Sequence, residues 1–418
     1  MELEEDDKIL CMSFNQDGSC FCIGTESGFS IYNSYPLKLS CKRKMDGGIG
    51  IIEMFNRSNI IALVGGGSNP NFDRNKVILY DDSQEKIITE IIVIFNVLNV
   101  KLKRTKIFII GEGQINVFAF SNNYLKIDSI NTYQNKAGIF GISLESNSNI
   151  ICYPSSMGEI TIKNYDKKTE DKYETKVLKA HQSEIVALVM NNDGSLIATA
   201  SKQGTIIRIY QTKDCALIQE LRRGTKNSEI FSLVFNYNSK YLACSSSQGT
   251  IHIFCVKNEQ NEVQNTKSVF GAIVGFFGFN NDYLNSEWSF AQYHLELKER
   301  SVISFNNLNS FSGKTKKSNI MNNTNSFLNN YELNLSTKKA QNINIKKKKN
   351  NKNNKNNKKS YSKEKIGEFI YINLKEKEKK EEEEEEEEEE KQKEEEEKKI
   401  ENNNNNKIYK KRRPKNTS

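Results

Sequence analysis

The chain has 418 residues, of which 36% are hydrophobic and 27% charged, so it is long enough for one large folded domain or two smaller ones. Its formal net charge of +8 says little about partners, because a lysine run and an unbroken glutamate run, Glu381 to Glu390, share the C-terminal region. No apolar stretch reaches the roughly 18 residues of a spanning helix, the acidic N-terminus is unlike a secretory signal, and the eight cysteines show no paired spacing. These features predict a cytosolic protein with reduced thiols and only peripheral membrane contacts.

Composition divides the chain into a globular part and a low-complexity part. Regular apolar runs continue to about Asn306, and beyond it Asn, Lys and Glu dominate. We therefore predict a folded region over residues 1–306, a mostly disordered insertion over 307–362, a last strand over 363–374 and a disordered charged tail over 375–418.

The folded part contains an internal repeat. Three windows of equal length align without a gap, residues 14–28, 190–204 and 235–249, and each has a turn, a strand and a second turn. The same signature at Asn75 and at residues 113 and 158 gives marks at 28, 75, 113, 158, 204 and 249, with spacings of 47, 38, 45, 46 and 45. These spacings are close to the roughly 40 to 45 residues of a four-stranded blade in a WD-type propeller.

A seventh mark, Gly367, follows Gly249 by 118 residues, and the surplus over one repeat matches the Asn/Lys-rich insertion. We therefore predict an all-β, seven-bladed β-propeller of the WD-repeat type whose last blade is interrupted. Residues 330–336 are a candidate for a strand of that blade. The alternative is a last blade that is short by one strand.

Two adjacent arginines, Arg222 and Arg223, lie where one repeat ends and the next begins. Successive side chains of an extended segment point to opposite sides, so we expect the two guanidinium groups to enter different pockets. A guanidinium group binds phosphate in bidentate fashion, so the pair predicts two phosphate sites side by side. A solvated basic loop is the alternative.

Segments on both sides of this pair carry a resemblance to a known family. In chain order they are Phe14-NQDGSCFC, Gly48-IGIIEM, Ala62-LVGGGSNPNF, Asn75-KVILYDD, Ala180-HQSEI, Ala198-TASKQGTIIRIY, Gln219-ELRRGT, Cys244-SSSQGTIHIF and Ser286-EWSF. Together they resemble the PROPPIN family, the phosphoinositide-binding seven-bladed propellers of autophagy. The leucine before the arginine pair resembles the branch that includes the human family members three and four.

The resemblance implies two head-group sites selective for phosphatidylinositol 3-phosphate and the 3,5-bisphosphate. Arg222 would serve the blade-5 side and Arg223 the blade-6 side, with hydroxyl and imidazole groups adding directional hydrogen bonds. For a single serine or histidine the alternative is a place in the blade's own hydrogen-bond network, and for Arg208 it is a brace against the neighbouring blade. The implied lipid-binding residues are Arg222, Arg223, Gly224, His181, Ser183, Thr199, Ser201, Gly204, Thr205, Arg208, Ser246, Thr250 and His252.

Between blade six and the insertion lies a run dense in Phe, Ile and Val and interrupted by glycines, residues 269–279. Such a run favours a loop that inserts bulky side chains into the membrane interface, and the resemblance implies the family's inserting loop here. A buried strand of blade six is the alternative. The predicted inserting residues are Val269, Phe270, Ile273, Val274, Phe276, Phe277 and Phe279.

The resemblance also implies that the opposite rim, with Asn15 and Asp17, binds the lipid-transfer protein of autophagy. Catalytic and metal-ligand spacings are absent from the sequence, so we predict a non-enzymatic protein, a monomer, with no metal and no cofactor. Its expected membranes carry phosphatidylinositol 3-phosphate and are pre-autophagosomal, endosomal, vacuolar or plastid-like. The main alternative is a WD-repeat protein scaffold without lipid specificity, and nucleic acid is not an expected partner.

Overall fold

Mostly antiparallel β-strands and the turns between them make up the described part of the chain. The computed structural model describes residues 7–121, 123–165, 172–257, 264–267, 286–295, 300–305, 331–333, 336–338 and 369–376. These ranges contain no helix, and therefore none that is long and apolar enough to cross a membrane. The predicted insertion and tail fall outside these ranges apart from three short strands described below.

Five four-stranded sheets and one six-stranded sheet of the described residues form six blades, and the four strands of each blade pair in the order in which they occur in the chain. Short turns join the strands because antiparallel neighbours need only a hairpin. Blades one to three consist of β1 (Ile9–Phe14), β2 (Cys20–Thr25), β3 (Gly28–Asn33) and β4 (Lys38–Lys44), then β5 (Ile49–Met54), β6 (Ile60–Gly65), β7 (Lys76–Asp81) and β8 (Lys86–Ile92), then β9 (Asn99–Leu102), β10 (Lys106–Ile110), β11 (Gln114–Ala119) and β12 (Lys126–Asn131).

Blades four to six follow the same plan, with two additions on blade five. Their strands are β13 (Gly141–Ile142), β14 (Ile150–Ser156), β15 (Glu159–Tyr165) and β16 (Tyr173–Lys179), then β17 (Ile185–Met190), β18 (Leu196–Ser201), β19 (Ile206–Gln211) and β20 (Leu217–Arg222), then β21 (Ile230–Phe235), β22 (Tyr241–Ser246), β23 (Thr250–Cys255) and β26 (Ala291–His294). The additions to the outer edge of blade five are β25 (Glu287–Trp288) and β24 (Thr266–Lys267).

The prediction of seven blades is wrong, because the residues that the structure describes form six. The remaining sheet contains β27 (Ser301–Phe305), and β30 (Phe369–Glu376) lies between β27 and β29 (Ser336–Lys338). Its strands do not pair in chain order, and two of them lie on either side of a long insertion, so it lacks the hairpin order of a blade. A turn-and-strand signature such as Gly367 identifies one strand but cannot show the order in which the other strands of its sheet pair with it.

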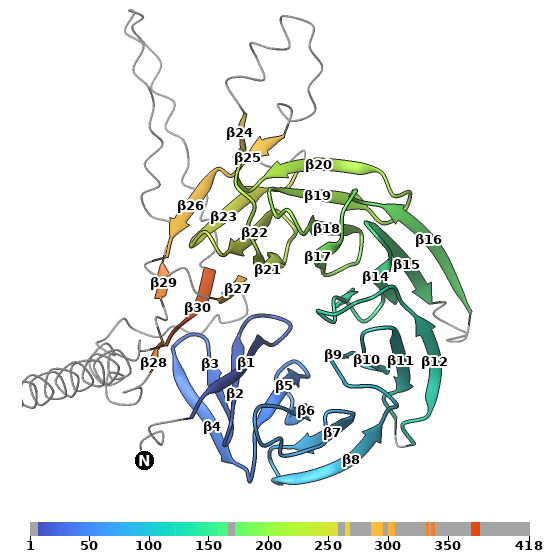
Figure 1. Cartoon of the computed structure of the whole chain (residues 1–418), viewed down its shortest axis with the longest axis vertical. Coiled ribbons are helices and arrows are strands. Elements are labelled where there is room, and N and C mark those ends of the chain that lie inside the picture. The colour runs from blue at the N-terminus through green and yellow to red at the C-terminus, as the bar shows by residue number, and fades with distance from the viewer. Residues whose placement is uncertain are drawn as a thin grey trace, which may run out of the picture. The chain divides into compact units, whose positions relative to one another are not determined.

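The chain divides into two units, residues 1–329 with 333–375 and residues 330–332 with 376–418, and β28 (Tyr331–Leu333) falls mostly in the second. In the first unit the blades follow one another around a centre, with their first strands innermost (Figure 1). The hydrophobic core lies between neighbouring blades. For example, Ile207 and Leu221 of blade five pack in one cluster with Leu242 and Phe254 of blade six.

The repeated asparagine of the sequence windows fixes the turn between the first and second strands. Oδ1 of Asn15, Asn191 and Asn236 accepts the backbone N–H five residues later, at 2.8 to 3.0 Å. Nδ2 of Asn15 also reaches the carbonyl oxygen of Asn56 on blade two at 3.1 Å, and Nδ2 of Asn191 reaches Ser239 Oγ on blade six at 3.0 Å. The repeat therefore encodes both a turn and a bond between blades.

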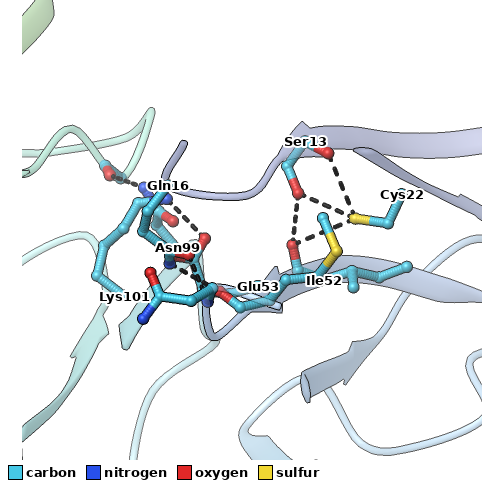
Figure 2. A network of polar contacts seen from close by, with 10 residues as sticks. Ser13, Gln16, Cys22, Ile52, Glu53, Asn99 and Lys101 are labelled. Carbon is cyan, nitrogen blue, oxygen red and sulfur yellow. Dashed lines mark hydrogen bonds and ion pairs between the residues drawn. The ribbon is translucent and has the colours of Figure 1, made fainter. Parts of the chain in front are cut away.

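A second polar network joins the first strands of blades one, two and three (Figure 2). Ser13 Oγ donates to the carbonyl oxygen of Ile52 at 2.8 Å. Lys101 Nζ lies 2.7 Å from Glu53 Oε2, and Gln16 Nε2 donates to Glu53 Oε1 at 3.2 Å. Burial raises the pKa of the Glu53 carboxyl, and Lys101 opposes this shift. Lys101 and Gln16 thus each bond one oxygen of the buried Glu53 carboxylate.

The outer strands of blades one, two, three and five each carry a β-bulge. The register with the neighbouring strand shifts at Ile31/Tyr32, Leu79/Tyr80, Val117/Phe118 and Ile209/Tyr210. A bulge bends an edge strand and interrupts its ladder of free backbone groups.

Candidate anion site at the arginine pair

The arginine pair lies at the outer edge of blade five. Arg222 ends β20, and its backbone pairs with Ile206 of β19 on one side and with Trp288 of β25 on the other. Both arginines are buried, with 1% of Arg222 and 3% of Arg223 exposed. Because consecutive side chains of a strand point to opposite sides, this edge delivers the two guanidinium groups in different directions.

The two guanidinium groups contact different segments. Arg222 Nε donates to Ser286 Oγ at 2.8 Å, just before β25. Arg223 Nε donates to the carbonyl oxygen of Gly204 at 2.7 Å, in the turn between β18 and β19, and its Nη2 donates to the carbonyl oxygen of Lys226. Arg222 is thus held by Ser286, which precedes β26 of blade six. Arg223 is held by two turns, one before and one after the arginine pair in the sequence.

Gly204 shapes the turn that holds Arg223. Its φ is +61°, and a Cβ at this position would lie 1.9 Å from the carbonyl oxygen of Ser228, so a larger residue collides with backbone. The carbonyl oxygen of Thr205 accepts the N–H of Arg223 at 2.9 Å. By contrast, a Cβ added to Gly224 meets nothing within 4 Å, so sterics do not require a glycine there.

Arg223 carries a buried charge that no carboxylate among the described residues pairs with. Its side-chain donors go to two carbonyl oxygens instead. Burial lowers the pKa of the guanidinium below its usual value. Burial, assisted by Arg223, also lowers the pKa of His252 to about 4, and burial raises the pKa of the Cys244 thiol to about 12. A buried cation without a counter-ion is costly, so this position favours an anionic ligand.

On the blade-five side a histidine and a threonine form one bonded pair. His181 Nε2 lies 2.9 Å from Thr199 Oγ1, whose hydroxyl donates to the carbonyl oxygen of Arg208 at 3.4 Å. Burial, followed by the charge of Arg208, lowers the pKa of His181 to about 4. Arg208 itself donates to Glu220 Oε2 at 2.9 Å and to the carbonyl oxygen of Ala180 at 2.8 Å, an arrangement that fits a brace.

On the blade-six side the predicted side chains bond to residues near β26. Thr250 Oγ1 lies 3.1 Å from His294 Nδ1, and His252 Nδ1 lies 3.0 Å from Ser289 Oγ. Ser246 Oγ is fully buried and has no hydrogen-bond partner among the described residues. Both sides of the pair thus present hydroxyl and imidazole groups, the types that bond phosphate oxygens in fixed directions.

The sequence profile of the PROPPIN family matches residues 8–327. The chain belongs to the PROPPIN family. PROPPINs are β-propellers that bind phosphoinositides and act in autophagy, and the arginine pair of this PROPPIN lies inside the matched region.

Named relatives of this PROPPIN agree with the profile. It is 33% identical to SVP1-like protein 2 of Pichia angusta over 70% of this chain and 82% of the relative. It is 31% identical to Autophagy-related protein 18e of Arabidopsis thaliana over 74% of this chain and 81% of the relative. The solved structure of Kluyveromyces lactis Hsv2 superposes with a TM-score of 0.59 at 26% identity, covering 72% of this chain and 87% of that one.

The structure also adds three residues that sequence reasoning did not single out, Ser286, Ser289 and His294. They contact Arg222, His252 and Thr250, from which they are 64, 37 and 44 residues away in the sequence. Ser286 and Ser289 both lie in the Ser286-EWSF segment of the resemblance. That was the only signal available, and it did not show which side chains these serines face.

Other predicted residues of this PROPPIN have varied surroundings. Ser201 is buried and its carbonyl oxygen accepts the N–H of Gly204 at 2.7 Å, while Ser183 and Thr205 are half-buried. Asn15 is buried in its turn, whereas Asp17 is exposed and accepts the N–H of Ser19 at 2.9 Å. All seven predicted membrane-inserting residues, within 269–279, lie outside the described residues.

Proposed function

We propose that this PROPPIN recognises phosphatidylinositol 3-phosphate and phosphatidylinositol 3,5-bisphosphate on membranes and recruits autophagy machinery to them. The buried guanidinium of Arg223 carries this proposal, because its charge is offset by carbonyl dipoles and by no carboxylate of the described residues. A phosphate provides the missing negative charge, and charge-assisted hydrogen bonds of this kind are among the stronger ones in proteins.

The hydroxyl groups around the pair support a phosphate ligand over a simple counter-ion. Ser246 Oγ is buried without a partner, and a buried polar atom without a hydrogen bond costs about 1 to 3 kcal/mol. A phosphate oxygen accepts such a hydrogen bond and that of a neighbouring donor at the same time. Side chains of fixed direction therefore distinguish phosphate positions on the inositol ring, whereas the arginines supply attraction.

Membrane attachment in this proposal needs two kinds of contact. Head groups bound at the rim hold the protein weakly, and insertion of the apolar run 269–279 adds a second contact on the same surface. Because both act on one membrane, the second contact forms at high effective concentration and multiplies the affinity.

The partners follow from the family and not from the site. We propose that a monomer binds the autophagy lipid-transfer protein through the rim that carries Asp17, at phosphatidylinositol 3-phosphate-bearing membranes in the cytoplasm. The name of the Arabidopsis thaliana relative, Autophagy-related protein 18e, supports the pathway.

Vesicle flotation tests the function. The full chain is mixed with phosphatidylcholine vesicles that contain a few per cent of phosphatidylinositol 3-phosphate, or of phosphatidylinositol as the control lipid. We expect binding only with the 3-phosphate, and a loss of about 100-fold when Arg222 and Arg223 are both changed to Ala, since each removes a charge-assisted bond. The matched control changes Arg57 and Arg104, which are exposed, to Ala and removes the same charge elsewhere.

A protein scaffold without lipid specificity is the second candidate. The observation that favours it is that both arginines are almost fully buried and bonded within the chain, as structural arginines are. In that case the folded double variant still floats, or the wild-type chain ignores the 3-phosphate.

A further inference from the structure

Strand β16 of blade four has a longer uninterrupted edge than the outer strands of the other described blades. Those of blades one, two, three and five carry a β-bulge, β25 also covers β20 of blade five, and β26 of blade six has only four residues. The seven residues of β16 all pair with β15 without a shift of register, and β16 is the outermost described strand of its sheet (Figure 1). A long, straight edge of this kind is a template for a further strand.

The backbone groups on the open side of β16 belong to alternate residues. Ala180, directly after β16, donates its N–H to the carbonyl oxygen of Gly158 at 2.9 Å. Tyr165 of β15 donates its N–H away from β16, to the carbonyl oxygen of Asn149 at 3.1 Å. Because antiparallel pairs alternate between hydrogen-bonded and non-hydrogen-bonded ones, both bonds place the inward groups of β16 on its even-numbered residues. The N–H and C=O groups that face outward therefore belong to Tyr173, Thr175, Val177 and Lys179.

The exposed side chains of β16 form a pattern that complements itself. Tyr173 and Val177 are 52% and 59% exposed, and Glu174 and Lys176 are exposed as well. A second copy of β16 can pair with the first in antiparallel register about Thr175. Tyr173 of each copy then lies opposite Val177 of the other, and Glu174 of each lies opposite Lys176 of the other. Aromatic side chains opposite β-branched ones, and opposite charges opposite each other, both stabilise a strand pair.

The backbone allows the same register. Thr175 faces its own counterpart and Tyr173 faces Val177, and these are residues whose N–H and C=O groups point outward. In an antiparallel pair, residues that face each other in this way exchange two N–H···O bonds. The neighbouring registers that the backbone also allows, about Glu174 or about Lys176, place like charges directly opposite each other, which is destabilising. Side chains and backbone therefore agree on the register about Thr175.

Pairing at this edge is weak. Two seven-residue strands bury less surface than the roughly 1,200 to 2,000 Å² of a stable interface, so dilute copies separate. Lys176 Nζ already donates to the carbonyl oxygen of Lys213, and an ammonium group with three donors keeps others for a carboxylate. Pairing therefore needs a high local concentration of the chain.

We propose that β16 is a self-association edge, at which two copies of this PROPPIN join their fourth blades into one antiparallel sheet about Thr175. Dilute copies remain monomers and concentrated copies pair. This inference goes beyond the function proposed above and does not depend on lipid binding.

Sedimentation equilibrium of the full chain over a range of concentrations measures the pairing. For the wild type we expect a monomer–dimer equilibrium with a dissociation constant on the order of 0.1 mM. Glu174→Lys and Lys176→Glu each place like charges opposite each other twice, so each should weaken pairing about tenfold. The double variant with both changes restores opposite charges and should remain within about threefold of wild type. Glu90→Lys, at an exposed position of the bulged strand β8, is the matched control and should pair like wild type.

A proline tests the backbone part of the proposal. Thr175→Pro removes an outward N–H and leaves the inward bonds to β15 in place, so we expect pairing to be lost. Thr175→Val keeps the N–H and is expected to pair like wild type. Circular dichroism checks the fold of both variants, and the charge variants test the edge even where the proline variant folds poorly.

A zero-length cross-link identifies the residues in contact. Unlabelled and ¹⁵N-labelled chains are mixed in equal amounts and treated with a carbodiimide, which activates a carboxylate and joins it to an adjacent amine as an amide. Mass spectrometry is expected to find Glu174 of one isotope linked to Lys176 of the other. This mixed link should be absent from Thr175→Pro.

Two outcomes contradict the proposal. A wild-type chain that stays monomeric at every concentration and gives no mixed-isotope link shows that this edge receives a strand of another protein or none. Self-association that is unchanged in both single charge variants shows that a different surface joins the copies.

Discussion

The two sides of the arginine pair use a histidine in opposite ways. On the blade-six side His252 gives its Nδ1 to Ser289, and on the blade-five side His181 gives its Nε2 to Thr199. The Thr199 proton goes to the Arg208 carbonyl oxygen, so the threonine accepts from His181 and leaves Nδ1 without a proton. Burial lowers the pKa of both rings to about 4, so both are neutral at pH 7.

The difference teaches that residue type and pKa do not define a phosphate donor. The hydroxyl partner contacts opposite ring nitrogens on the two sides. Gln292 Nε2 donates to Ser289 Oγ at 3.0 Å, so we expect Ser289 to donate to His252 Nδ1 and the ring proton to stay on Nε2, whereas His181 is left with an unprotonated Nδ1. We therefore expect the blade-six side to bind phosphate as it stands, and the blade-five side to bind better once His181 gains a proton.

The largest effect is expected from Gly204, whose turn accepts a bond from Arg223 and lies against the Ser228 carbonyl. Gly204→Ala places a Cβ against the Ser228 carbonyl at a positive φ, so we expect a loss of roughly 2 to 4 kcal/mol in the free energy of unfolding and no vesicle binding. Gly224→Ala, next to the pair but in open space, is expected to change stability by less than about 0.5 kcal/mol. Chemical denaturation measures both, and equal effects refute this assignment of the turn.

Alanine at each histidine tests the comparison directly. At pH 7.4 we expect His252→Ala to weaken binding to phosphatidylinositol 3-phosphate vesicles about tenfold, because a hydrogen-bond donor is lost. His181→Ala is expected to stay within about twofold, because an unprotonated Nδ1 contributes little. Titration by vesicle sedimentation gives both values, and the reverse order means that the tautomers are assigned wrongly.

A smaller effect is expected from pH. A bound phosphate favours protonated His181 and raises its pKa, so lowering the pH from 7.4 to 6.0 should strengthen wild-type binding about threefold relative to His181→Ala. The ratio of the two proteins cancels the titration of the phosphate itself, whose second pKa is about 6. Arg208 is the charged group beside His181 and opposes this protonation. An unchanged ratio contradicts the prediction.

The same histidines set the lower pH limit of that assay. The unfolded rings protonate near pH 6.5 and the folded ones near 4, so between these values the unfolded chain binds more protons. Folding stability therefore falls as the pH decreases through this range. A buried histidine such as His252 accounts for on the order of 3 kcal/mol of this loss. Binding at pH 6.0 is accompanied by a check of the fold.

Local signals in the sequence predicted the fold well where strands follow one another closely. The windows that start at Phe14, Met190 and Phe235 predicted turns that the structure forms with their asparagines. The prediction of a seventh blade is wrong because it takes the surplus over one repeat, within the 118 residues from Gly249 to Gly367, as an insertion in a complete blade. Strand order across such a gap depends on tertiary contacts, which periodicity does not record.

At the arginine pair, too, the local sequence pattern predicts one feature correctly and misses those that depend on contacts between distant segments. Alternation along β20 predicts that Arg222 and Arg223 diverge, and the structure brings them to different segments. It does not predict Ser286 or Ser289, because parallel pairing of β25 with β20 joins segments that are far apart in the sequence. The proton positions of the histidines depend on those partners and were equally out of reach.

The bulges on the outer strands have a consequence for crowding. A peripheral protein accumulates on a two-dimensional surface, where sheet edges of neighbouring copies meet far more often than in solution. Strand β8 alone presents Ile87, Ile88 and Ile92 to solvent, yet its bulge, opposite Leu79/Tyr80 of β7, bends the edge there. Kinked edges disfavour β-zippering between copies, so we expect the bulged edges of blades one, two and three to resist edge-to-edge association.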